Sequence, residues 1–136
     1  MLTLPNKQAN QYTSSRQLIN GDDINNLVSQ LNSNEVGITA RAGGGQANAY
    51  QLKTATNELT TVATNADSVK LPKGIPGLEV WVQNAGAANA QVFVYNTGTI
   101  NGTDGSAIGV ALNSGSVAVY KCMKVTAAGV ETWVSK

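Results

Sequence analysis

The sequence predicts an all-β protein, in which an antiparallel sandwich or jelly-roll-like domain follows an extended N-terminal arm and one short helix. Short apolar runs recur at intervals of roughly ten residues, and turns rich in Gly and Asn separate them. The chain also contains 14 Val among its 136 residues. Such a series of short strands is typical of antiparallel sandwiches and barrels. We place the arm and helix, with a role in attachment, in residues 1–36 and the β-sandwich domain in residues 37–136.

The N-terminal part divides into an arm and a helix. Residues 1–17 are polar and have no hydrophobic periodicity, which is typical of an arm that a partner must hold in place. Residues 21–23 (Gly-Asp-Asp) offer a cap and an acidic first turn. One helical face then follows, made of Ile24, Leu27, Val28 and Leu31. A helix of this length is marginal alone, so we expect it to dock on another surface.

The β pattern starts at Val36 and continues to the end of the chain. Leu78, Val80 and Val82 alternate with polar or aromatic neighbours, which predicts a half-buried strand with Trp81 on its outer side. Val117 and Val119 alternate in the same way. The expected strands occupy residues 49–52, 59–63, 68–71, 78–83, 91–95, 107–112, 116–123 and 130–134.

Charge and composition exclude several classes of protein. The net charge of +1 gives no electrostatic attraction for nucleic acid or an anionic membrane. With one Cys and no His, the chain cannot form a Cys/His zinc site, a His-based catalytic triad or an internal disulfide. The first residues show no basic region followed by an apolar run, so we expect no signal peptide, and no apolar run is long enough to span a membrane. We therefore expect synthesis in a cytoplasm, with no nucleic acid and no membrane as partners.

The chain replaces charge with neutral polar groups. Charged residues make up 12% of the chain, about half of the usual share. Asn and Gln are abundant instead, with 15 and 8 residues. A surface of this kind suits a protein that packs against copies of itself or against a large partner.

None of the candidate chemical sites is supported by its surroundings in the sequence. Residues 43–45 (Gly-Gly-Gly) lack the Lys and Ser/Thr of a phosphate-binding loop, so a tightly packed loop is the better interpretation. Residues 101–105 resemble a calcium-binding turn only loosely. Cys122 has no His to activate it and fits a small buried residue. Four carboxylates fit a solvated surface better than an acid–base pair: Asp67, Glu79, Asp104 and Glu131. We expect no enzyme activity, no cofactor and no metal.

Trp81 has three possible roles, because it faces away from the apolar side of its strand. It could stack against a sugar, anchor an interface or lie beneath the N-terminal helix. Each of these roles stays open from the sequence alone.

Five segments together resemble the head decoration, or capsid cement, proteins of tailed bacteriophages: residues 42–49 (AGGGQANA), 66–72 (ADSVKLP), 77–86 (GLEVWVQNAG), 91–95 (QVFVY) and 100–102 (ING). The resemblance covers about residues 20–136. It implies an all-β homotrimer on the outer surface of a capsid, where it bridges neighbouring major capsid subunits. It implies no catalysis and no cofactor.

The resulting hypothesis is a structural virion protein, located on the capsid outer surface, whose partners are the major capsid protein and its own copies. The alternative is a phage tail or baseplate protein, or a carbohydrate-binding receptor module. For packing or interface contacts the candidates are Trp81, Phe93, Tyr95 and Tyr120. For attachment they are Tyr12, Leu18, Ile24, Leu27 and Leu31.

Overall fold

The structure is a computed structural model that describes residues 33–136. The contacts within the chain divide it into two units, Met1–Ser33 and Asn34–Lys136. The predicted arm and helix, apart from their last few residues, lie outside the described part. The first described strand already begins at Asn34, and all described strands belong to the second unit.

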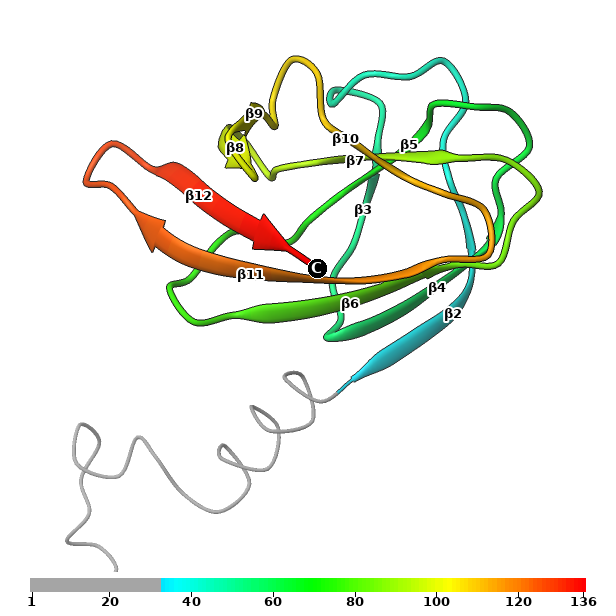
Figure 1. Cartoon of the computed structure of the whole chain (residues 1–136), viewed down its shortest axis with the longest axis horizontal. Coiled ribbons are helices and arrows are strands. Elements are labelled where there is room, and N and C mark those ends of the chain that lie inside the picture. Colours follow the sequence, from blue (N-terminus) through cyan, green and yellow to red (C-terminus); the bar gives the residue numbers. More distant parts are fainter. Residues whose placement is uncertain (1–32) are drawn as a thin grey trace, which may run out of the picture. The chain divides into compact units, whose positions relative to one another are not determined.

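The described unit is all-β, with strands in two sheets and no helix among residues 33–136. Figure 1 shows the sheets as an upper layer with β5, β7 and β10 and a lower layer with β4, β6 and β11. The seven-stranded sheet has the order β2 (Asn34–Thr39), β4 (Thr56–Thr61), β6 (Glu79–Asn84), β11 (Val117–Val125), β12 (Val130–Ser135), β8 (Thr97–Ile100) and β9 (Thr103–Asp104). The four-stranded sheet has the order β10 (Val110–Leu112), β7 (Ala90–Phe93), β5 (Asp67–Lys70) and β3 (Tyr50–Gln51).

Both sheets are mixed, so the expected antiparallel arrangement is wrong. The strands β2, β4 and β6 are parallel neighbours in one sheet, and β3, β5 and β7 are parallel neighbours in the other. From β2 to β7 the chain alternates between the two sheets, and each return adds a strand parallel to the previous one. Parallel neighbours need a long connection, and here the strand in the opposite sheet provides it in place of a helix.

Antiparallel pairing appears in the second half of the chain. The strand β10 pairs with β7, and β11 pairs with both β6 and β12. The predicted turns at residues 101–102 and 128–129 each join antiparallel neighbours, β8 to β9 and β11 to β12. At the first of these turns Asn101 and Gly102 both have positive φ, 52° and 84°. An Asn-Gly pair in this conformation favours a tight hairpin.

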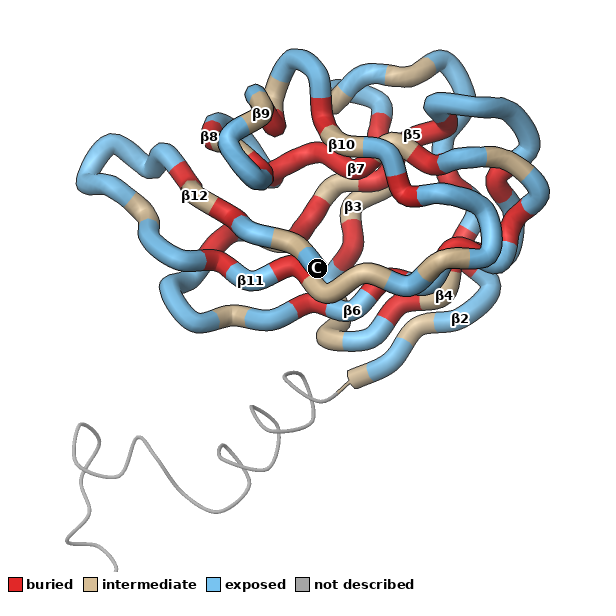
Figure 2. The backbone as a smooth tube through the Cα atoms, viewed as in Figure 1, coloured by how far each residue is buried: buried red, intermediate tan, exposed pale blue. Residues whose placement is uncertain are grey.

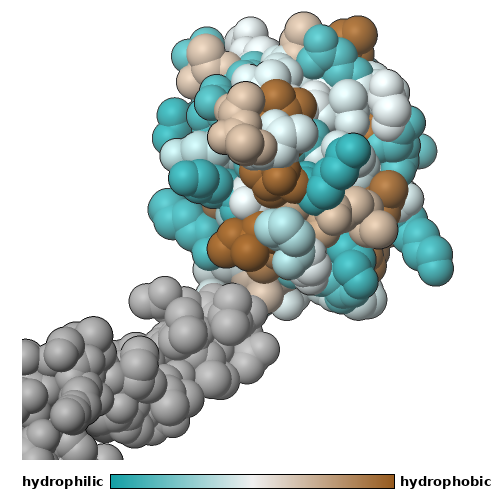
Figure 3. Space-filling view, turned by 90° about the vertical axis from the view of Figure 1, so that its left-hand side faces the viewer, coloured by the Kyte–Doolittle hydropathy of each residue, from teal (hydrophilic) through white to brown (hydrophobic). Residues whose placement is uncertain are grey.

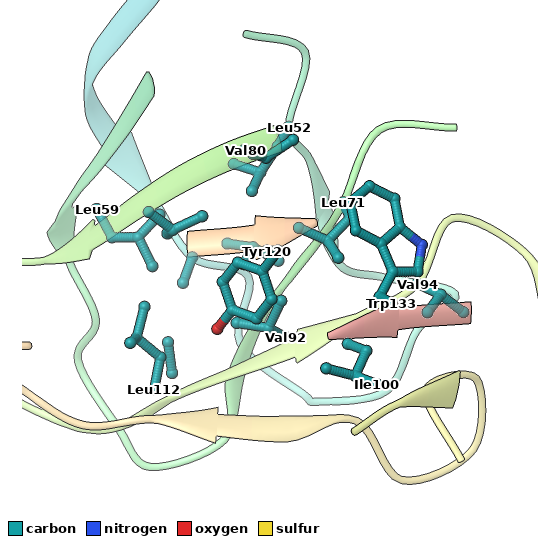
Figure 4. Packing of buried hydrophobic residues seen from close by; sticks show 14 of the residues in the cluster. Leu52, Leu59, Leu71, Val80, Val92, Val94, Ile100, Leu112, Tyr120 and Trp133 are labelled. Atoms are coloured by element: carbon teal, nitrogen blue, oxygen red, sulfur yellow. The ribbon is translucent and has the colours of Figure 1, made fainter. Parts of the chain in front are cut away.

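The hydrophobic core lies between the two sheets. Figure 4 shows Tyr120 of the larger sheet beside Val92 of the smaller one, with Leu112 of the smaller sheet and Trp133 of the larger sheet on either side of this pair. All four side chains belong to one cluster and are at most 4% exposed. Cys122 is also fully buried and free, which confirms its predicted role as a small core residue.

Most expected strands are present, with shifts of a few residues at their ends. The alternation along β6 is confirmed, since Val80 and Val82 are buried while Trp81 is 47% exposed (Figure 2). In β11 the prediction had the wrong face. Tyr120 is buried there and Val117 is exposed, because Tyr120 pairs with buried Val80 across the sheet. The strands β8 and β9 were not predicted.

Two of the four carboxylates expected on the surface are buried instead. Asp67 accepts hydrogen bonds from the backbone N–H groups of Ala63 and Thr64 and from the Thr64 hydroxyl. Glu131 accepts bonds from the Gly74 N–H at 2.6 Å and from the Trp133 indole N–H at 2.8 Å. Burial of a carboxylate is tolerated when hydrogen bonds replace its water. Both residues therefore hold loops onto the core.

The glycine-rich segment at residues 43–45 forms a loop, as expected. All three glycines have positive φ, between 64° and 93°. Residues with a side chain strongly disfavour this conformation. The next residue, Gln46, donates from its amide to the carbonyl oxygens of Val94 and Asn96 at 2.8 and 2.7 Å. The loop is thus tied to the segment that follows β7, which is a structural role.

Candidate functional site: the outer face of the larger sheet

An apolar surface lies on the outer face of the seven-stranded sheet, on the strands β6, β11 and β12. We call it the outer patch and define it by Trp81, Val117, Val119, Met123 and Val134. Four of these side chains are between 41% and 52% exposed, and Val119 is half-buried. Monomeric proteins seldom expose large apolar side chains together, and such groups mark interaction sites.

The register of the strands brings these residues together. Trp81 lies directly opposite Val119, and Lys121 lies opposite Val134. The inward neighbours Val80 and Tyr120 pair in the core one position away, so the alternation of side chains fixes the outer residues on the solvent side. Met123 follows at a bulge between Cys122 and Lys124.

One pair of opposite charges lies within this face. The Lys121 ammonium is 3.8 Å from the Glu79 carboxylate, and both side chains are about half exposed. The pair is neutral in total and adds little stability to the folded chain, because both groups are solvated.

A shallow hollow of about 420 Å³ lies next to Trp81 on the same face. Trp81 does not line it, but Val119, which lies opposite Trp81 across the sheet, does. The floor and rim come from Glu79, Val119, Lys121, Val134, Ser135 and Lys136. The outer patch therefore combines an exposed aromatic side chain with a recess of mainly apolar lining. Figure 3 shows a neighbouring side of the domain, where hydrophobic residues stand in separate groups among hydrophilic ones.

The structure separates the other candidate contact residues. Tyr95 is 41% exposed and follows β7. The strand β7 belongs to the four-stranded sheet, whereas the outer patch lies on the seven-stranded one. Phe93 and Tyr120 are 3% and 1% exposed, so they act in packing rather than as interface anchors. The attachment candidates Tyr12, Leu18, Ile24, Leu27 and Leu31 lie outside the described residues.

Four members of the outer patch are not among the contact residues predicted from the sequence: Val117, Val119, Met123 and Val134. The sequence did contain a signal for three of them. If Tyr120 is assigned to the core, then Val117, Val119 and Met123 fall on the opposite side of the same strand. The bulge between Cys122 and Lys124 interrupts this alternation only after Met123. Val134 needs the pairing with Lys121, which no local pattern provides.

A second hollow, of about 280 Å³, lies beside the loosely calcium-like turn and includes Asp104 in its lining. The Asp104 carboxylate accepts bonds from the backbone N–H groups of Ala107 and Ser106 at 2.9 Å. These bonds lower the pKa of Asp104, with the Ala107 N–H as the largest cause. Across residues 33–136 no three His, Cys, Asp or Glu side chains come together as a metal-binding group.

Cys122 is an unreactive thiol in its present surroundings. Burial raises its pKa, and the nearby charge of Glu131 raises it further. The thiolate is the reactive form of a cysteine, so these two effects suppress its reactivity at neutral pH.

Comparisons with known proteins add no relative. No protein-family model, no curated protein and no solved structure matches the chain. In the part of the chain that the structure covers, no helix has the length and hydrophobicity to cross a membrane.

Proposed function

We propose that this chain is a structural virion protein, which binds the outer surface of a phage capsid as an oligomer and links neighbouring major capsid subunits. The observation that carries the proposal is the outer patch, an apolar surface through which this charge-poor β domain can associate into an oligomer. A contact that depends on apolar burial rather than on charge is little affected by salt. The resemblance of the five sequence segments to capsid decoration proteins supplies the identity of the partner.

The properties of the chain suit a role in holding a lattice together. A protein that binds only the expanded capsid stabilises that state by mass action. An oligomer that makes several weak contacts at once gains avidity over each single contact. In this proposal the N-terminal residues provide attachment to the capsid, while the described β domain provides the rigid body.

For the architecture, we propose to class the two facing sheets as a sandwich. The core residues that both sheets contribute support this class. A jelly roll has antiparallel strands throughout. The parallel pairing of β2 with β4, of β4 with β6 and of β5 with β7 does not favour it.

Co-sedimentation with capsids tests the proposal. The purified full chain is mixed with expanded capsids that were assembled without it, and with unexpanded capsids as the control. We expect saturable binding to the expanded form, with a fixed number of copies per capsid. Absence of binding to expanded capsids would contradict the proposal.

A carbohydrate-binding module is the second candidate, and the exposed indole of Trp81 is the observation in its favour. Sugar sites usually combine an aromatic platform with several polar groups. The residues directly beside Trp81 across the sheet are Val119 and Thr56, which give few such groups. Specific binding on a glycan array that Trp81→Ala abolishes would favour this candidate over the capsid protein.

A further inference from the structure

The outer patch contains two features that complement each other on one surface. The indole of Trp81 is 47% exposed on β6, and the hollow beside it lies mainly over β11 and β12. The hollow, at about 420 Å³, is large enough to receive an indole ring. Its lining includes Val119 and Val134, which would contact the ring faces, and Lys121, whose cation would lie close to the ring.

We infer that the outer patch binds the outer patch of a second copy of this chain about a two-fold axis, with Trp81 of each copy inserted into the hollow of the other. In a two-fold contact the same surface serves both partners, so each feature must find its complement on that surface. An exposed indole and a hollow on one face satisfy this condition.

The charge arrangement favours a copy of this chain over a partner of different charge. Glu79 and Lys121 are 3.8 Å apart, and Lys136 also lines the hollow, so acidic and basic groups lie close together on this face. When two such faces meet about a two-fold axis near the pair, Lys121 of one copy approaches Glu79 of the other. A strongly acidic or basic partner would leave one of the two charges opposed by a like charge.

The same geometry selects two copies rather than three. A closed ring of three needs the protruding and the receiving surfaces to be inclined to each other, so that each subunit turns the next by a third of a circle. Here both surfaces belong to the outer face of one sheet, and apposing them turns the second copy through half a circle. This differs from the homotrimer that the resemblance implies, and it does not depend on whether the protein binds capsids.

Sedimentation equilibrium of the full chain, over a wide range of concentration, measures the assembly directly. We expect a reversible monomer–dimer equilibrium, with a limiting mass of twice the 14.1 kDa of the chain. A limiting mass of three chains overturns the two-fold pairing. A monomer at all concentrations overturns self-association, and the patch would then belong to another protein.

Trp81→Lys tests whether this face is the one that pairs. We expect the dissociation constant of the dimer to rise by at least about tenfold, as for a central aromatic anchor. Ile108→Lys is the matched control, because Ile108 is 60% exposed and lies outside the outer patch, and it should leave the dimer unchanged. Near-ultraviolet circular dichroism and the urea midpoint establish that both variants are folded. Equal effects of the two variants, or none from Trp81→Lys, overturn the assignment of the face.

The charge pair allows a second test that does not depend on loss of binding. Lys121→Glu makes the pair wholly acidic and Glu79→Lys makes it wholly basic, so each variant alone should dimerise more weakly than the natural chain. Mixed together, the two variants should form the heterodimer in preference to either homodimer, which native mass spectrometry distinguishes once one variant is isotope-labelled. A statistical mixture overturns the proposed approach of Lys121 to Glu79.

Capsid binding is measured separately on the same variants. A dimer in solution that fails to bind capsids would contradict the proposed function and leave the pairing intact. A chain that binds capsids but stays monomeric when free would contradict the pairing and leave the proposed function intact.

Discussion

The Glu131 carboxylate accepts a hydrogen bond from the backbone N–H of Gly74 at 2.6 Å, between residues 57 positions apart in the sequence. Its other oxygen accepts the indole N–H of Trp133 at 2.8 Å. One buried carboxylate thus links the loop before β6 to the last strand and orients the largest side chain of the core. Both oxygens act as acceptors, which an amide in the same place cannot reproduce because half of it is a donor.

Glu131→Gln should therefore lower the free energy of unfolding by about 1–3 kcal/mol, since one buried N–H loses its acceptor. Urea denaturation at neutral pH measures the change. Glu79→Gln is the control on the surface, measured at a concentration where the chain is monomeric, and loss of the exposed pair with Lys121 should cost less than about 1 kcal/mol. Equal losses for the two variants would show that Glu131 does not anchor the loop.

Gly86→Ala tests a close approach in the turn between β6 and β7. A Cβ atom at this position would lie 2.4 Å from the backbone nitrogen of Val62 and 2.7 Å from its Cβ. Backbone atoms cannot yield cheaply, so we expect a loss of about 1–3 kcal/mol, as for overpacking in a core. Ala87→Ser adds one atom to an exposed neighbour in the same turn and should be close to neutral. A neutral Gly86→Ala would mean that the turn can move away from Val62.

Tyr120→Phe should leave stability unchanged or increase it slightly. The Tyr120 side chain is 1% exposed, burial raises its pKa, and its hydroxyl has no hydrogen-bond partner among the described residues. Removing an unsatisfied buried hydroxyl removes a cost rather than a bond. A loss above about 1 kcal/mol would instead show that a bound water or another group serves this hydroxyl.

Tyr50→Phe provides the contrast to Tyr120→Phe. The Tyr50 hydroxyl donates to the Glu35 carboxylate at 2.6 Å, and this bond is the largest cause of the raised pKa of Tyr50. We expect Tyr50→Phe to cost about 1 kcal/mol, because the bond to a charged acceptor connects β2 to β3. The changes in the free energy of unfolding that the two Tyr→Phe variants cause should differ in sign or size. Identical urea midpoints would contradict this account.

Acid should weaken the fold through two aspartates. Hydrogen bonds lower the pKa of Asp67, with the Thr64 hydroxyl as the largest cause, and also lower the pKa of Asp104, with the Ala107 N–H as the largest cause. A lowered pKa in the folded state means that the stabilising contribution is complete above the unfolded value of about 3.9. It is lost as the pH falls from there through the folded pKa.

The urea midpoint between pH 7 and pH 2.5 measures this loss. In the variant with Asp67→Asn and Asp104→Asn the midpoint should be lower at neutral pH and should fall less steeply in acid, so the two curves converge. Parallel curves would assign the acid sensitivity to other groups.

Deletion of residues 1–20 should abolish capsid binding and leave the β domain folded. Both described sheets are built from Asn34 onward, so the deletion removes no strand from them. Circular dichroism and the urea midpoint follow the fold, and co-sedimentation with expanded capsids follows binding. Full retention of binding would contradict the assignment of attachment to the N-terminal residues.

The sequence predicted the β class and most strands because its local patterns act over a few residues. The strict alternation of exposed and buried residues along β6, with Trp81 outward, could be seen directly. The parallel pairing could not be seen, because a turn such as residues 84–86 looks the same whether the chain turns back beside itself or crosses to the other sheet. The short-hairpin interpretation of these turns led to the antiparallel prediction.

The candidate site was predictable only in part. Trp81 came from alternation, but Val134 belongs to the patch through its register with Lys121. Glu131 and Asp67 were assigned to the surface because carboxylates usually lie there. The Gly74 N–H, 57 positions from Glu131, comes close only when its loop has folded back. Thr64 is three positions from Asp67 and binds it within a local turn, which the sheets then bury. Burial of a charge depends on such contacts, which composition and periodicity do not encode.

The most direct test of the proposed function is cryo-electron microscopy of the virion, compared between the phage that carries this gene and the same phage without it. We expect the difference density to lie on the outer surface of the head, at repeated positions where major capsid subunits meet, and to fit the two-sheet domain of residues 34–136. Difference density confined to the tail or baseplate, or no difference at all, would contradict the capsid assignment.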